Sequence, residues 1–357
     1  MADKVTLVVG ERELSVWSSY KVTHDLYLGA GHFTLECGRI DWKIPDAALC
    51  KLYVNDQLEL TGIVDRISAS YDKKGEKLTI EGRDLMGLVV DSSCEEFFSV
   101  AGMKLSELAR RLLGKLFTFN RALVIGDDIV GGLKRKQKQG SKDCLFLGDK
   151  PQVITQLHVG MTVFQVLRDY AMSRGLMFYC LPDGTFTFGK PKSLGGEVVR
   201  TLIHRLDGVG NNIISGEYER DSAKRYSSVR VMGMQQGQDE MGMEPTKMIN
   251  STTLPDPTFP FHKALVVKNN NDYQSTELHA QMLLERMRHE GLKLNYKVAR
   301  HSQGGENWGI NRLCRVRDQA LNVGLDGTYL IYGRTFSMSK SEGQITELRL
   351  GPPGVVA

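Results

Sequence analysis

The acidic residues that could form a catalytic pair stand side by side in the sequence, as Glu95-Glu96 and Asp239-Glu240. A glycosidase needs two carboxyl groups that flank the scissile bond, so its acids must converge in space. Adjacent acids are what any solvated turn contains. We therefore assign no catalytic residue. The alternative is a peptidoglycan hydrolase that uses Asp239 or Glu240 together with Glu244.

Patterns for metal or cofactor binding are equally weak. His279 and His289 share a predicted helix, but they are ten residues apart, which is about 15 Å along a helix axis. The six cysteines include no C-x-x-C pair, and the phosphate-loop, zinc-protease and nucleophile-elbow motifs are missing from the sequence. We assign no metal and no cofactor, and interpret the cysteines as small buried residues of a protein that folds in a reducing cytoplasm.

One basic run could contact phosphates. Residues 131–142 read GGLKRKQKQGSK and contain five basic side chains and no acid. The net charge of the chain is only +4, and no aromatic residue lies among the basic ones. Both facts favour a solvated loop over a nucleic-acid site. The alternative is binding to DNA or to an acidic partner through Lys134, Arg135, Lys136 and Lys138.

The elements around these residues are mostly strands. Lys51–Cys94 reads as a β-meander, with turn residues at Asn55-Asp56 and from Lys73 to Gly75. Apolar residues alternate with polar ones along it, which predicts strands that bury one face. The residues expected on the buried face are Leu58, Leu60, Ile63, Ile67, Ala69, Tyr71, Leu78 and Ile80.

The central hairpin of this meander has a second copy near the C-terminus, in Tyr329–Gly351. Aligning Ile67–Ser70 with Phe336–Ser339 brings both runs to a glycine soon afterwards, Gly75 and Gly343. We therefore predict an internal duplication, with two related antiparallel barrels or sandwiches in one chain.

Helical patterns separate the two copies. Leucines at spacings of three and four predict a helix over 104–116, and Thr162 with Gln165 forms a capping box for a second. A hairpin is expected over 176–188. A third helix is expected between Ser275 and Gly291, followed by a half-buried strand from Leu292 to Val298.

These elements predict an α+β, mainly β protein, because strands predominate and the helices lie between them. The expected parts are a first barrel over 1–94, an α+β domain over 95–200, a second barrel from 201–234 and 292–357, and a helix-containing insertion over 235–291. The length of 357 residues suits several such domains.

The order of these parts resembles a known family. The resemblance is carried by Val5-Thr6-Leu7 with Trp17-Ser18-Ser19, by Gly62–Asp65 with Thr79–Asp84, by Thr162–Leu167, and by the helix Ala280–Arg288 that leads into Leu292. In this order, the chain is similar to the baseplate hub proteins of contractile-tailed, Mu-like phages, to the late control protein D family and to the hub part of type VI secretion spikes.

The resemblance implies a structural protein of the virion tail baseplate, assembled in the bacterial cytoplasm, and not an enzyme. It implies a homotrimer in which six similar barrels form a ring between the six-fold tail tube and the three-fold central spike. The expected partners are the spike, the tail tube and other baseplate proteins. DNA would pass through the lumen transiently and without specific binding. The four parts leave no residues for a hydrolase domain.

Overall fold

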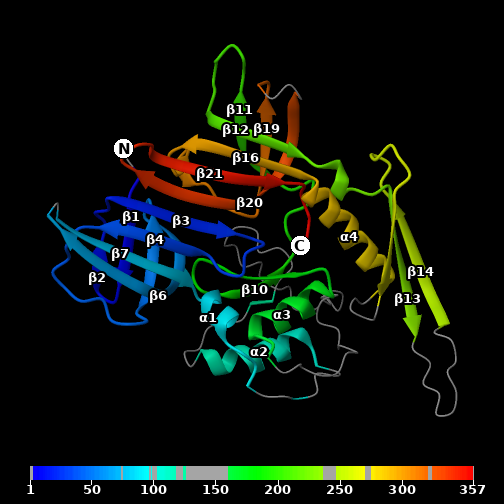
Figure 1. Cartoon of the computed structure of the whole chain (residues 1–357), viewed down its shortest axis with the longest axis horizontal. Coiled ribbons are helices and arrows are strands. Elements are labelled where there is room, and N and C mark those ends of the chain that lie inside the picture. Colours follow the sequence, from blue (N-terminus) through cyan, green and yellow to red (C-terminus); the bar gives the residue numbers. More distant parts are fainter. Residues whose placement is uncertain are drawn as a thin grey trace, which may run out of the picture.

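The computed structural model of the protein is mostly β, and in Figure 1 its N-terminal and C-terminal strands lie above a group of short helices. It describes residues 3–73, 75–95, 98, 103–117, 124–125, 160–235, 247–269, 275–320 and 324–356. This composition confirms the predicted α+β, mainly β class. Closure of the two barrels stays a prediction, because pairing among the described strands follows an open path.

The N-terminal strands form the first unit. Alternate residues point into its core, and Leu7, Leu35, Leu52 and Ile80 are fully buried there. The strands are β1 (Val5–Val9), β2 (Arg12–Leu14), β3 (Ser19–Asp25), β4 (His32–Cys37), β5 (Leu49–Val54), β6 (Gln57–Asp72) and β7 (Gly75–Asp84).

The second unit is assembled from two separate stretches of the chain. The predicted strand after the third helix lies at its centre, where Leu294, Tyr296 and Val298 are buried in alternation, as expected. The strands are β11 (Val198–His204), β12 (Ile213–Arg220), β16 (Leu292–Ala299), β19 (Arg312–Asp318), β20 (Leu325–Ser339) and β21 (Gly343–Gly351). A two-stranded ribbon of β17 (Ser302–Gln303) and β18 (Glu306–Asn307) lies between β16 and β19.

The two units have the same strand order. Neighbouring strands run β1-β5-β6-β7-β4-β3 in the first and β11-β19-β20-β21-β16-β12 in the second. Four of the five neighbour pairs are antiparallel in both units. The fifth pair differs, since β1 is antiparallel to β5 whereas β11 is parallel to β19. This shared order supports the predicted duplication.

The register of the two long hairpins matches as well. Each has a bulge, between Val64 and Arg66 in β6 and between Ile331 and Gly333 in β20. After it, the first hairpin pairs from Arg66 with Glu81 to Asp72 with Gly75, and the second pairs from Gly333 with Arg349 to Ser339 with Gly343. These ladders align Ala69 with Phe336. The predicted alignment of Ile67 with Phe336 was wrong by two residues, although the glycines at the turns were matched correctly.

The same alignment places Cys50 of β5 over Cys314 of β19. Cys50 pairs with Gly62, and Cys314 pairs with Tyr329, the equivalent residue of β20. Both thiols are buried, and burial raises the pKa of each to about 12. The cysteines are therefore equivalent core residues of the two units, in keeping with their predicted role.

Three helices and a small sheet follow the first unit and share one core. The helices are α1 (Met86–Asp91), α2 (Leu105–Leu116) and α3 (Val163–Met172), and the sheet contains β8 (Val124–Ile125), β9 (Met177–Cys180) and β10 (Phe186–Gly189). The Thr162 and Gln165 capping box is confirmed in both directions. Helix α1 was not expected, because its residues were assigned to the meander. No helix in the described part of the chain is long and apolar enough to cross a bilayer.

The insertion forms a separate three-stranded sheet covered by one helix. Its strands are β13 (Ser228–Gln235), β14 (Lys247–Pro255) and β15 (Ala264–Asn269), and helix α4 (Thr276–Glu290) packs on them. Ser275 caps α4 as predicted. β13 was expected in the second barrel, but it pairs with β14 and β15 here, at the side of the molecule in Figure 1. The other domain limits stay predictions.

Two glycines test this description by opposite responses to alanine. A Cβ at Gly62 in β6 would overlap the backbone carbonyl oxygen of Arg83, whereas a Cβ at Gly114 in α2 would meet nothing. We expect Gly62→Ala to lower the free energy of unfolding by about 1–3 kcal/mol. We expect Gly114→Ala to raise it by about 0.5–1 kcal/mol, because alanine favours the helix. Chemical denaturation at one fixed protein concentration measures both, and equal effects would contradict the placement of Gly62.

Candidate functional site at the junction of the two units

The two units are joined through a strand pair, which we call the β3–β20 junction. Strand β3 runs antiparallel to the second half of β20, from Asp25 opposite Gly333 to Tyr20 opposite Met338. The strands lie side by side in Figure 1, with β3 in blue and β20 in red-orange. The pairing makes one 13-stranded sheet of both units. Residues more than 300 positions apart therefore share a backbone ladder.

Apolar side chains make the core continuous across the β3–β20 junction. Val22 and Phe336 stand opposite each other, and both are fully buried. Tyr20 is 5% exposed, and it packs in the same cluster with core residues of both units. Burial of an aromatic and an aliphatic side chain contributes about 1.5–3 kcal/mol each. The junction is therefore part of the core.

A buried ion pair also joins the two units beside the β3–β20 junction. Nη2 of Arg334, on β20, donates to Oε2 of Glu59, on β6, at 2.8 Å, and the two side chains are 3% and 10% exposed. The guanidinium also donates to the carbonyl oxygen of Trp308 and lies 3.9 Å from the ring centroid of Phe336. Asn307 donates to the other Glu59 oxygen at 2.7 Å. Each charge thus has a fixed counter-charge and further polar contacts.

Two histidines of this region are held neutral. Burial, followed by the nearby charges of Arg334 and His32, lowers the pKa of His24 to about 3. Burial lowers the pKa of His301 to about 4, with nearby Asp3 opposing and Arg334 adding to the shift. Such values lie well below the range in which a histidine exchanges protons at neutral pH. Neither residue is suited to general acid–base chemistry.

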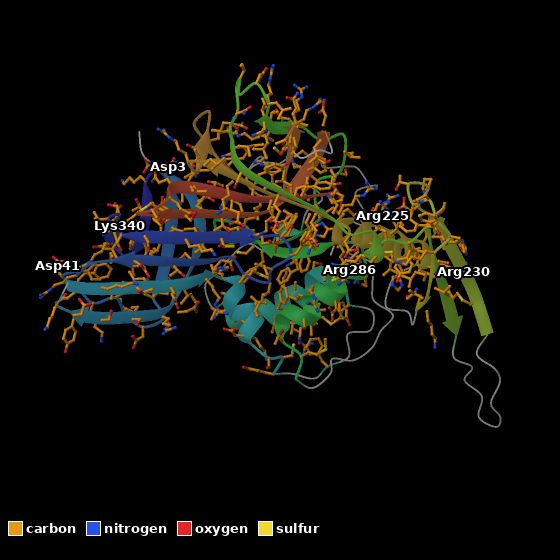
Figure 2. The ribbon with its side chains drawn as sticks, turned by 45° about the horizontal axis from the view of Figure 1, so that its top comes forward. Asp3, Asp41, Arg225, Arg230, Arg286 and Lys340 are labelled. Carbon is orange, nitrogen blue, oxygen red and sulfur yellow. The ribbon has the colours of Figure 1, made fainter. Side chains whose placement is uncertain are left out.

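The N-terminal segment ties the units together from one end. Oδ2 of Asp3 accepts a hydrogen bond from the backbone of His301 at 2.8 Å, and the backbone of Asp3 donates to Gln344 at 2.8 Å. Nε2 of His301 lies 2.7 Å from the hydroxyl of Tyr20. Figure 2 shows Asp3 beside the red strands of the second unit. Side chains from both ends of the chain therefore stabilise the same junction.

A second buried charge cluster holds the insertion to the second unit. Asp256 is 2% exposed and accepts from Arg225 at 2.8 Å and from Arg288 at 3.0 Å. Burial would raise the pKa of Asp256, but hydrogen bonds from Arg288, Thr258 and Arg225 hold it well below its usual range. A cavity of about 400 Å³ beside it is lined by Tyr218, Arg220, Arg225 and Arg288, among others. The carboxylate is fully engaged in structural contacts, so it is not available as a catalytic base.

Most of the residues that the sequence marked for possible chemistry lie outside the described residues. These are Glu96, Asp239, Glu240, Glu244 and the basic run at 134–142.

Among the described residues, Glu95 is exposed, and no group of three or more His, Cys, Asp or Glu could hold a metal ion. His289 packs between the rings of Tyr27 and Tyr332, at centroid distances of 4.8 and 4.9 Å.

The tryptophans lie in core or rim positions. Trp308 is 2% exposed, and Trp17 donates to the carbonyl oxygen of Val5 at 2.9 Å. Trp42 is partly buried against the main core and lies under Arg12. No two of them form a platform for a sugar ring in the contacts of the described residues.

The first unit is similar to a known family of phage proteins. Residues 4–84 match the family model of the Mu phage baseplate assembly protein GpP-like, N-terminal domain. The first unit is therefore similar to the GpP-like N-terminal domain. The match ends at Asp84, the last residue of β7, so it coincides with the first unit.

Solved structures extend the similarity beyond residues 4–84. The chain is 25% identical to the tail protein from Neisseria meningitidis MC58, with a TM-score of 0.77 over 99% of this chain and 97% of that one. It is 19% identical to the 43 kDa tail protein of prophage MuSo2 from Shewanella oneidensis, with a TM-score of 0.75 over 98% of each chain. A component of the E. coli type VI secretion system shares the fold at 10% identity, with a TM-score of 0.56 over 97% of this chain and 76% of that one.

No curated protein matches the sequence. The resemblance to Mu-like tail proteins and type VI spike proteins is confirmed by the matching family model and structures. Sequence reasoning missed the β3–β20 junction, through which the first unit contacts the second unit. No local sequence pattern indicates that Glu59 and Arg334 form an ion pair, because they are 275 residues apart.

The buried ion pair of the β3–β20 junction gives a stability prediction. Glu59→Gln leaves the Arg334 guanidinium buried without its counter-charge, so we expect the free energy of unfolding to fall by about 3–5 kcal/mol. The matched control is Asp326→Asn, since Asp326 pairs with Arg315 at 2.9 Å on the surface and such pairs contribute about 0–1 kcal/mol. Urea denaturation compares the two. Equal losses would contradict a structural role for the buried pair.

His301 gives a prediction for pH. Its folded pKa of about 4 lies below the unfolded value of 6.5, so its contribution is complete above pH 6.5 and is lost as pH falls toward 4. The loss from one such group is at most about 1.4 kcal/mol per pH unit. Asp84 has the opposite effect on the unfolding free energy between pH 3.8 and pH 7. Burial raises its pKa to about 7 despite hydrogen bonds from Gly31 and Met86.

Because His301 and Asp84 have opposite effects, the test compares the pH dependence of the unfolding free energy between the wild type and a variant. We expect His301→Gln to lose less unfolding free energy than the wild type between pH 6.5 and 4, measured by urea denaturation at each pH. Glutamine can keep a hydrogen bond to Tyr20 but takes up no proton. Parallel curves for the two proteins would contradict a neutral, buried His301.

Proposed function

We propose that the protein is the baseplate hub of a contractile phage tail or tail-like particle. Three copies form a ring of six similar units, which adapts the six-fold tail tube to the three-fold central spike and forms part of the DNA channel. The observation that carries this proposal is the shared strand order of the two units within one chain. Two equivalent units per chain give a trimer both a three-fold and an approximate six-fold symmetry.

The comparisons support the same proposal. The chain and the tail proteins of Neisseria meningitidis MC58 and prophage MuSo2 cover each other almost completely. The E. coli type VI relative is described as structurally similar to the bacteriophage T4 tail proteins gp27 and gp5. A fold that recurs in tails and secretion spikes suits a part that connects a tube to a spike. The spike, the tail tube and other baseplate proteins are the partners that we propose.

We further propose that the protein is not an enzyme and that it acts in the virion tail. Two buried carboxylates are engaged in ion pairs, Glu59 with Arg334 and Asp256 with Arg225 and Arg288. Their role in this proposal is to fix the orientation of the units and the insertion. DNA passes through the lumen during ejection without specific binding, since a tight grip would obstruct its passage.

The proposal predicts the mass of the particle in solution. Three chains of 39.9 kDa give about 120 kDa. We expect this mass by light scattering behind a sizing column at several protein concentrations. Binding should be measured with the candidate spike protein added as well, because the spike stabilises the trimer by mass action. A monomer or a dimer at every concentration, with and without the spike, would contradict the proposal.

A further inference from the structure

The far half of β6, Arg66–Tyr71, has an apolar face that nothing in the described chain covers. Ile67, Ala69 and Tyr71 alternate with polar residues there, and the sequence predicted that they are buried. All three are exposed instead, with 37% of Ile67 and 88% of Tyr71 accessible. Among the described strands, this half of β6 pairs with β7 on one edge only. Such a strand has both an unused backbone edge and an uncovered face.

The equivalent half of β20 in the second unit is covered. The aligned hairpins place Ile67, Ala69 and Tyr71 over Arg334, Phe336 and Met338. In β20, these positions are buried or half-buried because β3 of the first unit pairs along that edge. The chain therefore contains a structural template for what should cover β6.

Strand β12 is the second-unit equivalent of β3. Tyr20 of β3 pairs with Leu35 of β4, which pairs with Ile80 of β7. Gly216 of β12 pairs in the same way with Tyr296 of β16, which pairs with Leu348 of β21. β12 is bonded to β16 on one edge, and no described strand pairs with its other edge. Most of its residues are exposed, including Ile214 at 55%.

We propose that β12 of one subunit pairs with the far half of β6 in the next subunit, in the antiparallel register that β3 and β20 have within the chain. This inference rests on the proposed trimer and names the contact that holds it together. The template fixes the opposing residues. They are Asp221 with Arg66, Glu219 with Ser68, Tyr218 with Ala69, and Gly216 with Tyr71.

Side-chain sizes at the proposed contact are complementary. Within the chain, the inward-facing pairs are Val22 with Phe336 and Tyr20 with Met338, each one aromatic and one aliphatic side chain. The proposed pairs place the aromatic ring on the other strand and a small residue opposite, as Tyr218 with Ala69 and Tyr71 with Gly216. An aromatic ring across from a small residue or glycine packs over the space that the small residue leaves.

Charge complementarity follows the same template. Within the chain, Asp25 at the end of β3 binds Arg349 at 3.0 Å. The residue equivalent to Asp25 is Asp221, also an acid, whereas the residue equivalent to Arg349 is Glu81. Arg66, which lies across from Glu81 and only 3.7 Å from it, stands directly opposite Asp221 in the proposed register. The contact therefore keeps an acid–arginine pair at its end.

The proposed contact also explains how the ring of subunits closes. Each chain offers one unused edge on β12 and one on β6, so the contact is heterologous, with different surfaces on the two sides. Repeated in three subunits, it alternates with the three β3–β20 junctions and leaves none of these edges exposed. Pairing of every edge removes the tendency of such strands to aggregate.

A designed disulfide tests the register. Within the chain, the hydroxyl oxygens of Thr23 and Thr335 lie 3.2 Å apart, and the equivalent intersubunit pair is Glu219 with Ser68. We expect the double variant Ser68→Cys/Glu219→Cys, after mild oxidation, to give covalent dimers and trimers on non-reducing gels. The matched control is Ser68→Cys/Arg220→Cys, because Arg220 neighbours Glu219 but points to the opposite face of the strand.

The single variants Ser68→Cys and Glu219→Cys show whether a native cysteine takes part in the cross-link. Light scattering of the reduced double variant is measured in parallel. If the reduced double variant is a trimer but cross-links no better than the control and the single variants, the proposed strand pairing is wrong. The proposed trimer is then unaffected. A monomer at every concentration, with and without the spike, overturns both.

A second variant tests the apolar face without introducing cysteine. Ala69→Lys places a charge opposite Tyr218 in the proposed contact, but at a position that is exposed in the single chain. We expect the dissociation constant of the trimer to rise tenfold or more, a loss of about 1.4 kcal/mol or more, while the circular dichroism spectrum is unchanged. Glu13→Lys on the exposed strand β2 is the control, and an equal effect of both variants would overturn the proposal.

Discussion

The backbone edge of β3 is the constraint on which the rest of the structure depends. An open strand edge inside a folded chain must find donors and acceptors, because unsatisfied backbone groups are costly to bury. β3 meets this requirement with the second half of β20, at the other end of the chain. That ladder brings Val22 to Phe336, makes the two cores one, and buries the pair of Arg334 and Glu59. The two units are thereby held in one orientation.

Elements whose cause is local could be predicted from the sequence. Thr162 with Gln165 and Ser275 before α4 are caps that act within one helical turn, and both are found. The strand Leu292–Ala299 follows from strict alternation. The duplication was visible from the two hairpins and their turn glycines, although its register was missed by two residues. A two-residue shift preserves the alternation of faces, so hydrophobic pattern alone could not detect it.

Contacts between distant residues could not be predicted in this way. Nothing in the composition of Ser228–Gln235 indicates that it leaves the second unit for the insertion, because a strand pattern does not name its neighbour. The same limit applies to the candidate site, since Glu59 and Arg334 meet only after the two units have folded together. Ile67, Ala69 and Tyr71 are the informative exception. Their alternation predicted burial, and their exposure in the single chain pointed to the edge where a second copy is proposed to bind.

The arrangement of charges is consistent with a structural part. Glu59 and Asp256 form ion pairs with arginines, and these pairs fix elements to one another. Burial keeps His24 and His301 neutral. Rigid units with defined edges are what a ring between a tube and a spike requires. In the proposed particle, the same strand pairing is used twice, once within each chain and once between chains, so six units are related by nearly equal contacts.

The most direct test of this account is an image of the purified particle along its symmetry axis, obtained as class averages by electron cryomicroscopy. The account predicts a closed ring with three-fold symmetry and six similar lobes around a central opening, in which the insertions of the three subunits break the six-fold symmetry. A particle with two-fold symmetry, or three separate pairs of lobes without contact between neighbouring subunits, would contradict it.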